Sequence, residues 1–367
     1  MSKLREPLNI LRITLTIGET SAPYNQFSLA IATKHNITIC NYFKSNITPP
    51  KEITLFEGDD SLKGFFRVLK AAFDEREYDI VHAHTGHVGV FFLVANILYG
   101  RFACPTVFTV HNSYQNYKLR NKLLLIPAFA FFQRVVCCGQ ASFESFPGFF
   151  KWLADDRFCF VQNGVDIDRI DRVIGKNQEH VQNSYFTITT VGRLIEIKYP
   201  LSVLKAFQQC ADQASRLVFI GEGHMRGDLL TEIEASGFGN QVELTGLIPR
   251  DKVYEQLTRA NLFISTSAGE GFPIAVLEAM ACRCPVLLSD IPPHREINDG
   301  VDFIPLIHPD DVKGFAREIK RFRQMSSSER GEIGEKCRRL VEKRFSLTTM
   351  HREYEKVYSQ VLGKCKK

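Results

Sequence analysis

One segment of the chain joins an acidic side chain, flanking glycines and the expected start of a helix. It reads Ser267-Ala-Gly-Glu-Gly-Phe-Pro-Ile-Ala-Val-Leu-Glu278 and follows an apolar stretch that is typical of a buried strand. Pro273 suits the first position of a helix, where its missing N–H costs nothing. The free N–H groups and the positive dipole of a helix start favour a bound phosphate. The segment therefore predicts a binding site for a phosphorylated ligand.

Two carboxylates in this segment have a spacing that suits one extended ligand. Seven residues separate Glu270 from Glu278, which is about 12 Å along a helix. Glu278 stands between Leu277 and Ala279. Burying a carboxylate in such an apolar setting costs free energy unless the group has a function or a partner. The alternative is that both are solvated charges. We favour a pair that holds hydroxyls at two ends of a ligand.

Two cations occupy a similar position after another expected strand. Arg193 follows the strand directly, and Lys198 stands just before a helix that begins at Pro200. Each alone would more often be a surface charge. Together they are able to converge on a diphosphate, because charge-assisted hydrogen bonds to phosphate are strong and such cations stabilise a departing diphosphate without a metal.

The elements that must position these residues alternate between strands and helices. In the first half the pattern predicts strands over 8–17, 37–42, 79–84, 105–110, 134–138 and 158–161, and helices over 27–33, 62–73 and 88–99. In the second half it predicts strands over 186–191, 216–220, 242–244, 262–265 and 285–289, and helices over 200–211, 225–235, 252–259 and 274–282. Such alternation is typical of parallel sheets with crossover helices. Ligands of these sheets bind beyond the carboxyl ends of the strands.

The sequence therefore predicts an α/β protein with two doubly wound, Rossmann-like domains. We expect an N-terminal domain over 1–170, a polar linker over 171–184, a C-terminal domain over 185–345 and a last segment, 346–367, that packs back toward the first domain. In that last segment Tyr354, Val357, Tyr358 and Val361 form one apolar stripe at helical spacing.

Composition agrees with a globular protein. The 367 residues are 44% hydrophobic and 24% charged, and no apolar run reaches the roughly 20 residues that span a bilayer. The charged start, Met1 to Pro7, has no apolar core of a signal peptide behind it, so we expect a cytoplasmic protein. The ten cysteines have no C-x-x-C spacing and are expected to be reduced and mostly buried. A net charge of +5 is too small to indicate nucleic-acid binding.

These motifs resemble those of the retaining glycosyltransferases of family 4. The resemblance is dense in the second half and rests on Gly192-Arg193 with Lys198, Gly221-x-Gly223, the Glu270-x7-Glu278 segment, and Ala279-Met-Ala281 with Pro285-Val286. The first half fits more loosely, through Asp79-x-Val-His-Ala-His84, Thr109-Val-His111 and Val161-Gln-Asn-Gly-Val-Asp166. The resemblance implies the GT-B fold, in which two Rossmann-like domains face each other across a cleft.

The resemblance also implies a function and roles for single residues. The chain would move a sugar from a UDP- or GDP-linked donor to a glycan or a lipid-linked intermediate of cell-surface polysaccharide synthesis, with no cofactor and no metal. Glu278 would hold the donor ribose, Glu270 the donor sugar, Arg193 and Lys198 the diphosphate, and His111 would reach the sugar from the opposite domain. The remaining residues expected around the donor are Gly18, Gly192, Gly221, Leu247, Gly271, Phe272, Pro273 and Ile274.

Two positions depart from the family pattern. The first loop, Gly18-Glu-Thr-Ser-Ala-Pro-Tyr-Asn25, lacks the double glycine that is frequent there, which concerns the handling of the acceptor. Cys284 stands where a glycine commonly precedes Pro-Val, a small change.

Three other functions fit parts of the sequence. Gly221-Glu-Gly-His-Met-Arg-Gly227 imitates the fingerprint of an NAD-dependent dehydrogenase, but its glycines are out of phase and it follows the second strand of its domain instead of the first. A metal hydrolase with His82, His84, His87 and His111 as ligands would lack an acidic partner. A non-catalytic GT-B binding subunit would not need to retain both carboxylates and both cations.

One segment predicts contact with a membrane. No acidic residue occurs between Asp79 and Glu144, and the stretch from Tyr114 to Arg134 mixes cations with large apolar side chains. Such a stretch is able to lie on an anionic leaflet. The alternative is that Leu123 to Phe132 is a core helix of the first domain, kinked at Pro127.

Overall fold

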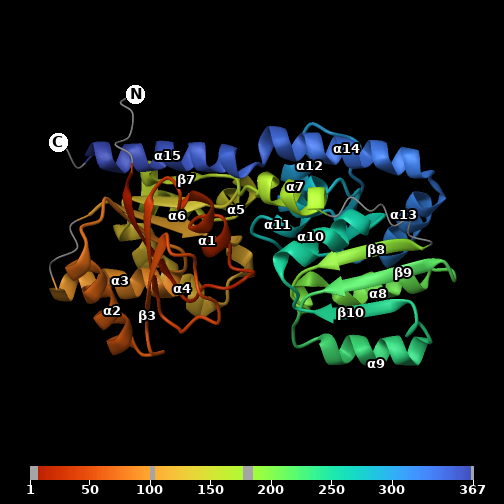
Figure 1. Ribbon diagram of the computed structural model, residues 1–367, viewed down its shortest axis with the longest axis horizontal. Helices are drawn as coiled ribbons and strands as arrows, with labels where there is room; N and C mark the ends of the chain where they lie inside the picture. Colours follow the sequence, from red (N-terminus) through yellow and green to blue (C-terminus); the bar gives the residue numbers. More distant parts are fainter. Residues whose placement is uncertain (1–6, 100–103, 177–184, 365–367) are drawn as a thin grey trace. The chain divides into compact units, whose positions relative to one another are not determined.

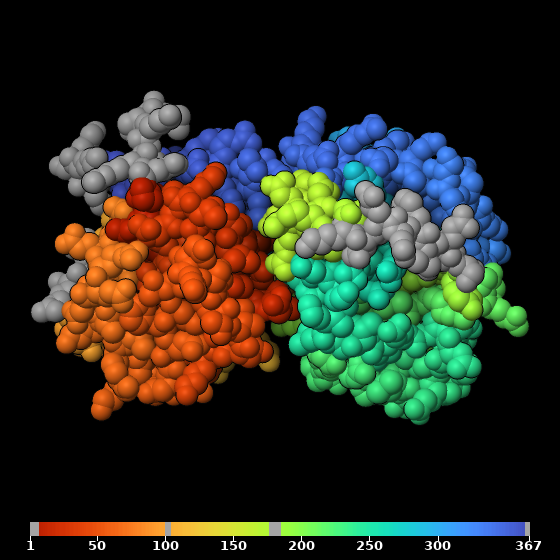
Figure 2. All heavy atoms as spheres, viewed as in Figure 1, coloured from red at the N-terminus to blue at the C-terminus, as the bar shows by residue number. Residues whose placement is uncertain are grey.

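The computed structural model describes residues 7–99, 104–176 and 185–364. The chain forms two compact units. The first joins Met1–Asn163 to the last helix, within Leu347–Lys367, and the second is Gly164–Ser346. Side chains fill the space between the ribbons of each unit (Figures 1 and 2).

The first unit contains a parallel sheet of seven strands in the order β3-β2-β1-β4-β5-β6-β7. The strands are β1 (Asn9–Thr14), β2 (Asn36–Asn41), β3 (Ile53–Glu57), β4 (Ile80–Ala83), β5 (Thr106–Val110), β6 (Arg134–Cys137) and β7 (Phe158–Phe160). The strand order reverses between β1 and β4, so the loops after these two strands flank the switch point, where doubly wound sheets bind ligands.

Helices cover both faces of this sheet. One face carries α2 (Leu62–Glu75), α3 (Gly86–Tyr99), α4 (Leu119–Phe131), α5 (Gln140–Glu144) and α6 (Gly148–Ala154) (Figure 1). The opposite face carries α1 (Ala22–Asn25), the 3-10 turn η1 (Leu29–Ile31) and α15 (Leu347–Lys364). The single helix expected over 27–33 is wrong, because only the short 3-10 turn η1 forms within that range.

The last helix of the chain belongs to the core of the first unit. Residues of α15 at helical spacing turn toward the sheet, and the buried ones are Leu347, Met350, Tyr354, Val357, Tyr358 and Val361. They pack with Ile10, Ile39 and Ile80 of the sheet. Because the whole apolar stripe of α15 is used in this packing, the helix is an integral layer of the unit.

The second unit contains a parallel sheet of six strands in the order β10-β9-β8-β11-β12-β13. The strands are β8 (Phe186–Val191), β9 (Ser215–Ile220), β10 (Val242–Gly246), β11 (Leu262–Ser265), β12 (Val286–Ser289) and β13 (Leu306–Ile307). The helices are α7 (Ile167–Lys176), α8 (Pro200–Gln208), α9 (Arg226–Ser236), α10 (Arg250–Arg259), α11 (Ile274–Ala281), α12 (Pro292–Asn298), α13 (Val312–Gln324) and α14 (Ser327–Arg344). Here the order reverses between β8 and β11.

The linker expected over 171–184 is wrong at its start. Residues up to Lys176 belong to α7, and 177–184 lie outside the described residues. The helix buries Ile170 and Val173, and Arg338 of α14 donates two hydrogen bonds to Asp171, at 2.8 and 2.7 Å. The helix therefore belongs to the second unit.

The predicted fold class is confirmed as two Rossmann-like domains. The cysteines in the described part of the chain are free thiols, and six of these nine are buried. None of the described helices is long and apolar enough to cross a bilayer. The segment 123–132 lies mostly in α4, a helix with Pro127 inside it, and buries Leu125, Ala128 and Phe129 in the first core.

Candidate functional site

The loops that follow β8 and β11 meet at the switch point of the second sheet. The amide of Ala268 donates to the carbonyl of Ile197 at 2.8 Å. The hydroxyl of Thr266 donates to the carbonyls of Lys198, at 3.2 Å, and Tyr199, at 3.0 Å. These bonds bring the predicted cationic segment against the predicted acidic segment, although about 70 residues separate them in the chain.

The backbone turns sharply between Lys198 and the next helix. Tyr199 has a positive φ of 50°, a left-handed conformation that is uncommon outside glycine. The short turn η4 (Glu196–Lys198) ends there, and Pro200 begins α8. The strained residue is held by the Thr266 hydroxyl, and strain of this kind concentrates at functional sites. The turn places Lys198 at the carboxyl edge of the sheet.

Lys198 and Glu270 form an ion pair where the loops after β8 and β11 meet. The Nζ of Lys198 donates to Oε1 of Glu270, and both side chains are largely buried. Burial alone would raise the pKa of Glu270, but the charge of Lys198, with His294 and hydrogen bonds from Lys198 and Ser267, lowers it below its usual value. Glu270 is therefore an ionised carboxylate at neutral pH.

A buried histidine beside this pair was not predicted. His294 of α12 is fully buried, and its Nδ1 lies 2.8 Å from the carbonyl of Ser289, which accepts from it. The Ser289 hydroxyl donates to the carbonyl of Ser267 at 2.6 Å. Burial lowers the pKa of His294 to about 4, so the ring is neutral at pH 7. The sequence held no signal for this residue, because Pro292-Pro-His294 is typical of an ordinary turn.

The helix that follows Glu270 begins at Ile274. Its N-cap, Pro273, provides no side-chain bond to the first amides of α11. Phe272 is buried and lies with its ring 5.7 Å from that of Phe345, which fixes the loop between Gly271 and the helix. The arrangement keeps the first N–H groups of an eight-residue helix available for an anion.

Glu278 has two partners on α10 that sequence reasoning missed. The residue is 5% exposed, and its carboxylate accepts from Nη1 of Arg250 and from the hydroxyl of Tyr254 at 3.1 Å. Arg250 and Tyr254 are four residues apart, on one side of the helix. Burial would lower the pKa of Arg250, but the Glu278 charge raises it above its usual value. The available signal was the position of Arg250, at the start of a helix and four residues after the last residue of β10.

The glycines near this site are explained by close backbone contacts. Gly221 has φ 142°, and a Cβ there would lie 2.0 Å from the carbonyl oxygen of Gly192. At Gly223 a Cβ would lie 2.1 Å from the carbonyl oxygen of Leu194. The Gly221-x-Gly223 pattern therefore lets the loop after β9 pack on the loop after β8.

Two predicted residues reach the solvent from these loops. Arg193 is exposed, and within the described ranges no ion pair involves it. Leu247, after β10, is 68% exposed. Both are therefore accessible to a ligand.

Two further predicted residues belong to the first unit. His111 follows β5, and its Nε2 lies 3.1 Å from Nδ1 of His84. Burial lowers the pKa of His111 to about 4, so it is neutral at pH 7. Gly18 lies in the loop after β1, where its carbonyl accepts from the amide of Ser21 at 3.0 Å. Both stand at the carboxyl edge of the first sheet.

Two family models match consecutive parts of the chain. The model described as Glycosyltransferase Family 4 matches residues 44–169, and the model described as Glycosyl transferases group 1 matches residues 173–343. The chain belongs to the family 4 glycosyltransferases. The segments that carried the resemblance in the second half all lie within the second match.

Relatives and solved structures agree with this family. The chain is 27% identical over 293 residues to a UDP-Gal:alpha-D-GlcNAc-diphosphoundecaprenol alpha-1,3-galactosyltransferase of Escherichia coli, covering 73% of each chain. It is 22% identical to an O-antigen biosynthesis glycosyltransferase of Escherichia coli, covering 89% of this chain and 94% of the relative. The fold matches Anabaena HepE in complex with UDP-glucose at a TM-score of 0.74 and 17% identity, covering 96% and 99% of the two chains.

The fold and the family exclude the dehydrogenase alternative. The Gly221–Gly227 segment follows β9, which is not a strand of the β8/β11 switch point, and two of its glycines, Gly221 and Gly223, serve loop packing. As to the metal hydrolase, no group of three or more His, Cys, Asp or Glu side chains with metal-binding geometry occurs in the part of the chain that the structure describes.

The buried Arg250–Glu278 pair makes a stability prediction. Arg250→Met leaves the Glu278 carboxylate buried without a counterion, which should lower the free energy of unfolding of the second unit by about 3–5 kcal/mol. Lys252→Met, which removes an exposed pair on the same helix, should cost at most about 1 kcal/mol. Chemical denaturation measures both.

The double variant Arg250→Met with Glu278→Gln should recover part of the lost free energy of unfolding, because the uncompensated carboxylate charge of Glu278 is removed. An Arg250→Met loss no larger than the Lys252→Met loss would contradict the burial of an ionised Glu278.

Proposed function

We propose that this glycosyltransferase moves a sugar from a UDP- or GDP-linked donor to an acceptor with retention of configuration at the anomeric carbon. The observation that carries the proposal is the Lys198–Glu270 pair beside the start of α11. It joins a cation, an ionised carboxylate and free helix amides at the switch point of one sheet. These are the groups that a diphosphate-linked sugar requires.

The two carboxylates differ in what they offer a donor. Glu270 accepts from a flexible lysine, which is able to turn to a phosphate while the carboxylate accepts from sugar hydroxyls. Glu278 is fixed by Arg250 and Tyr254, so its remaining lone pairs are oriented in advance. We assign Glu270 to the sugar and Glu278 to the ribose, and His111 of the first unit to the sugar as well.

The cations act on the leaving group. When the bond between the anomeric carbon and the diphosphate oxygen breaks, negative charge grows on that oxygen, and Arg193, Lys198 and the amides of α11 stabilise it. The acceptor oxygen bonds to the anomeric carbon, and its proton leaves with the diphosphate. Because these groups supply positive charge at the place where charge develops, no metal and no cofactor enters the proposal.

The acceptor is proposed to be a glycan or a lipid-linked intermediate of cell-surface polysaccharide synthesis. Relatives named for O-antigen and colanic acid biosynthesis support this class, as does a galactosyltransferase named for a diphosphoundecaprenol acceptor. We place the reaction in the cytoplasm, on the cytosolic face of a membrane.

A turnover assay tests the assignment of the cations. Arg193→Ala and Lys198→Ala should each lower kcat by ~10²–10³ with the UDP- or GDP-sugar that supports transfer, because a contact to the transition state is lost. Lys205→Ala, an exposed lysine on α8, is the matched control and should retain normal turnover. Near-normal turnover of the Arg193/Lys198 double variant would refute the proposed site, and NMR of the product reports retention or inversion.

Chelation tests the absence of a metal from the reaction. Turnover should persist in excess EDTA, since side chains and helix amides balance the diphosphate. Loss of turnover that returns on adding Mg²⁺ or Mn²⁺ would show that a metal takes part.

The outer face of α4 supports contact with a membrane. Leu119, Leu123 and Phe131 of α4 are exposed at four- and eight-residue spacings, opposite the buried face of the helix. The adjacent helix α6 adds exposed Phe149 and Trp152. Apolar side chains on neighbouring helices among cations, with no acidic residue from 80 to 143, suit an anionic leaflet.

Liposome flotation tests this contact. The protein should float with vesicles of phosphatidylglycerol and phosphatidylcholine at low salt and not with phosphatidylcholine alone, because each cation near an anionic surface contributes about 1 kcal/mol. The double variant Leu123→Ser with Phe131→Ser should lose flotation. Leu230→Ser, at an exposed leucine of α9 in the second unit, should not.

Flotation that survives replacement of Lys118, Arg120 and Lys122 by Gln would contradict the electrostatic part of this proposal. A wild-type protein that does not float at all would leave α4 as a core helix only.

A further inference from the structure

Polar side chains line one face of three adjacent strands in the core of the first unit. Arg12 of β1 stands in register with His82 of β4, and Thr109 lies on the neighbouring strand β5. All three are at most 1% exposed. His84 and His111 follow two residues after His82 and Thr109, and therefore share their face. Polar groups buried in a sheet are costly unless they are hydrogen-bonded.

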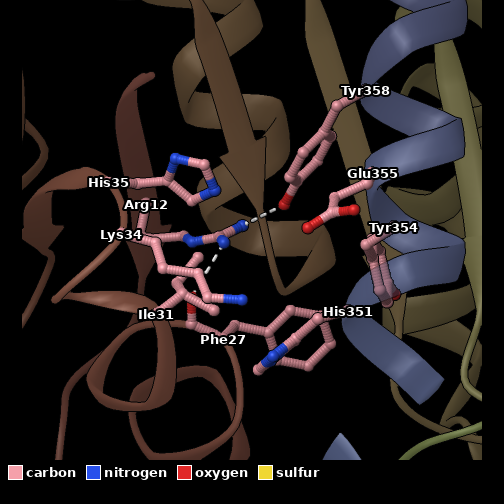
Figure 3. A pocket seen from close by; sticks show the side chains of 9 residues that line it. All are labelled: Arg12, Phe27, Ile31, Lys34, His35, His351, Tyr354, Glu355 and Tyr358. Carbon is pink, nitrogen blue, oxygen red and sulfur yellow. Dashed lines mark hydrogen bonds between the residues drawn. The ribbon is translucent and has the colours of Figure 1, made fainter. Parts of the chain in front are cut away.

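Two tyrosines of α15 complete the hydrogen bonds of this cluster. The hydroxyl of Tyr358 accepts from Nη1 of Arg12 at 2.8 Å and lies 2.9 Å from Nδ1 of His82. The hydroxyl of Tyr354 lies 3.0 Å from Oγ1 of Thr109. Figure 3 shows both tyrosines extending from α15, with the Arg12 guanidinium bonded to Tyr358 and to the carbonyl of Phe27. Residues more than 240 positions apart are thereby joined.

These partners determine the tautomer of His82. Arg12 Nη1 contacts Nδ1 of His82 and is only a donor, so Nδ1 must be the acceptor. Burial, with the charge of Arg12, holds the pKa of His82 well below its usual value, so the ring is neutral. Its single proton therefore lies on Nε2, which donates to Oγ1 of Thr109 at 2.7 Å. The ring is fixed from both sides.

The fixed ring of His82 supports the histidine expected to contact the sugar. His82 and His84 stack with centroids 4.2 Å apart and an interplanar angle of 21°. His84 Nδ1 lies 3.1 Å from His111 Nε2, and those two rings stack at 5.3 Å. The ring of Phe27 packs edge-on against all three histidines. The orientation of His111 therefore depends on His82 through His84, which contacts both rings.

We propose that Tyr354 and Tyr358 are positioning residues for His111, acting through His82 and His84. This inference rests on the proposed role of His111 at the donor sugar. The last helix of the chain thus helps to set the geometry of the reaction in addition to covering the sheet. The Tyr358 hydroxyl contacts Arg12 and Nδ1 of His82, and the Tyr354 hydroxyl contacts Thr109, the partner of Nε2, so both help to hold the His82 ring. The stacked rings transmit that orientation to the carboxyl edge of the sheet, where near-attack geometry is decided.

Tyrosine-to-phenylalanine variants test the inference. Tyr358→Phe and Tyr354→Phe keep the ring packing and remove only the hydroxyl. Each should lower kcat about ten-fold, the rate equivalent of one lost hydrogen bond, with little change in KM for the donor. The donors assayed are UDP-glucose, UDP-galactose and GDP-mannose. Tyr78→Phe is the matched control, because Tyr78 is also buried in the first unit and donates to the Ala72 carbonyl, but lies outside the cluster.

A spectroscopic readout does not depend on the donor. In the full chain with 15N-labelled histidine, the ring nitrogen shifts of His111, assigned by difference with His111→Asn, should change in both cluster variants and not in Tyr78→Phe. A purely structural role would lower the melting temperature while leaving the His111 shifts, and the kcat per folded molecule, unchanged. That result would overturn the inference.

A double-mutant cycle separates the two proposals. Adding Tyr358→Phe to His111→Ala should cause no further loss of kcat, because the residue that it positions is absent. Equal losses in both backgrounds would show that Tyr358 does not act through His111. Normal turnover of His111→Ala alone would instead refute the role of His111 in the proposed function.

Discussion

The ion pair between Lys198 and Glu270 depends on a property of parallel sheets. Strands β8 and β11 are neighbours although β9 and β10 lie between them in the chain, and the carboxyl ends of parallel strands reach one edge. The loops after these strands therefore meet, and hydrogen bonds from Ala268 and Thr266 hold them together. Each charge compensates the other in a largely buried setting, where neither would be tolerated alone.

The same requirement for compensation shapes the rest of both units. Glu278 is buried in α11 because Arg250 and Tyr254 of α10 satisfy it. Arg12 is buried in β1 because His82, Tyr358 and the Phe27 carbonyl satisfy it. In every case the partner comes from a different element, so the polar groups tie strands and helices into one arrangement. Networks of this kind orient their members closely, since few alternatives satisfy every group. That orientation suits them to hold a ligand.

Much of the fold followed from local patterns, and the misses have physical causes. The buried strands β1, β4, β5, β8 and β11 were predicted because they are short segments rich in apolar and β-branched residues that alternate with helical segments. Helix α7 was missed because four charged residues stand between Ile167 and Val173, and two of them, Arg169 and Asp171, find their ion-pair partners only in the folded unit. The helix expected over 27–33 does not form, since the hydroxyl of Ser28 bonds to the Pro23 carbonyl and the chain turns there. The burial of Leu125, Ala128 and Phe129 confirms the segment 123–132 as part of a core helix, while membrane contact of the exposed face of α4 stays a proposal.

The sequence alone indicated the family, the fold class and the charged residues of the candidate site, because these depend on residue types at short spacing. Lys198, Glu270 and Glu278 were identified from such spacing. Only the tertiary structure decided their partners. Arg250 reaches Glu278, His294 lies beside Glu270, and Tyr354 and Tyr358 reach His82 and its neighbours from the far end of the chain. Such pairings leave no local pattern, because they arise when the chain packs and each buried charge or hydroxyl takes the nearest available partner.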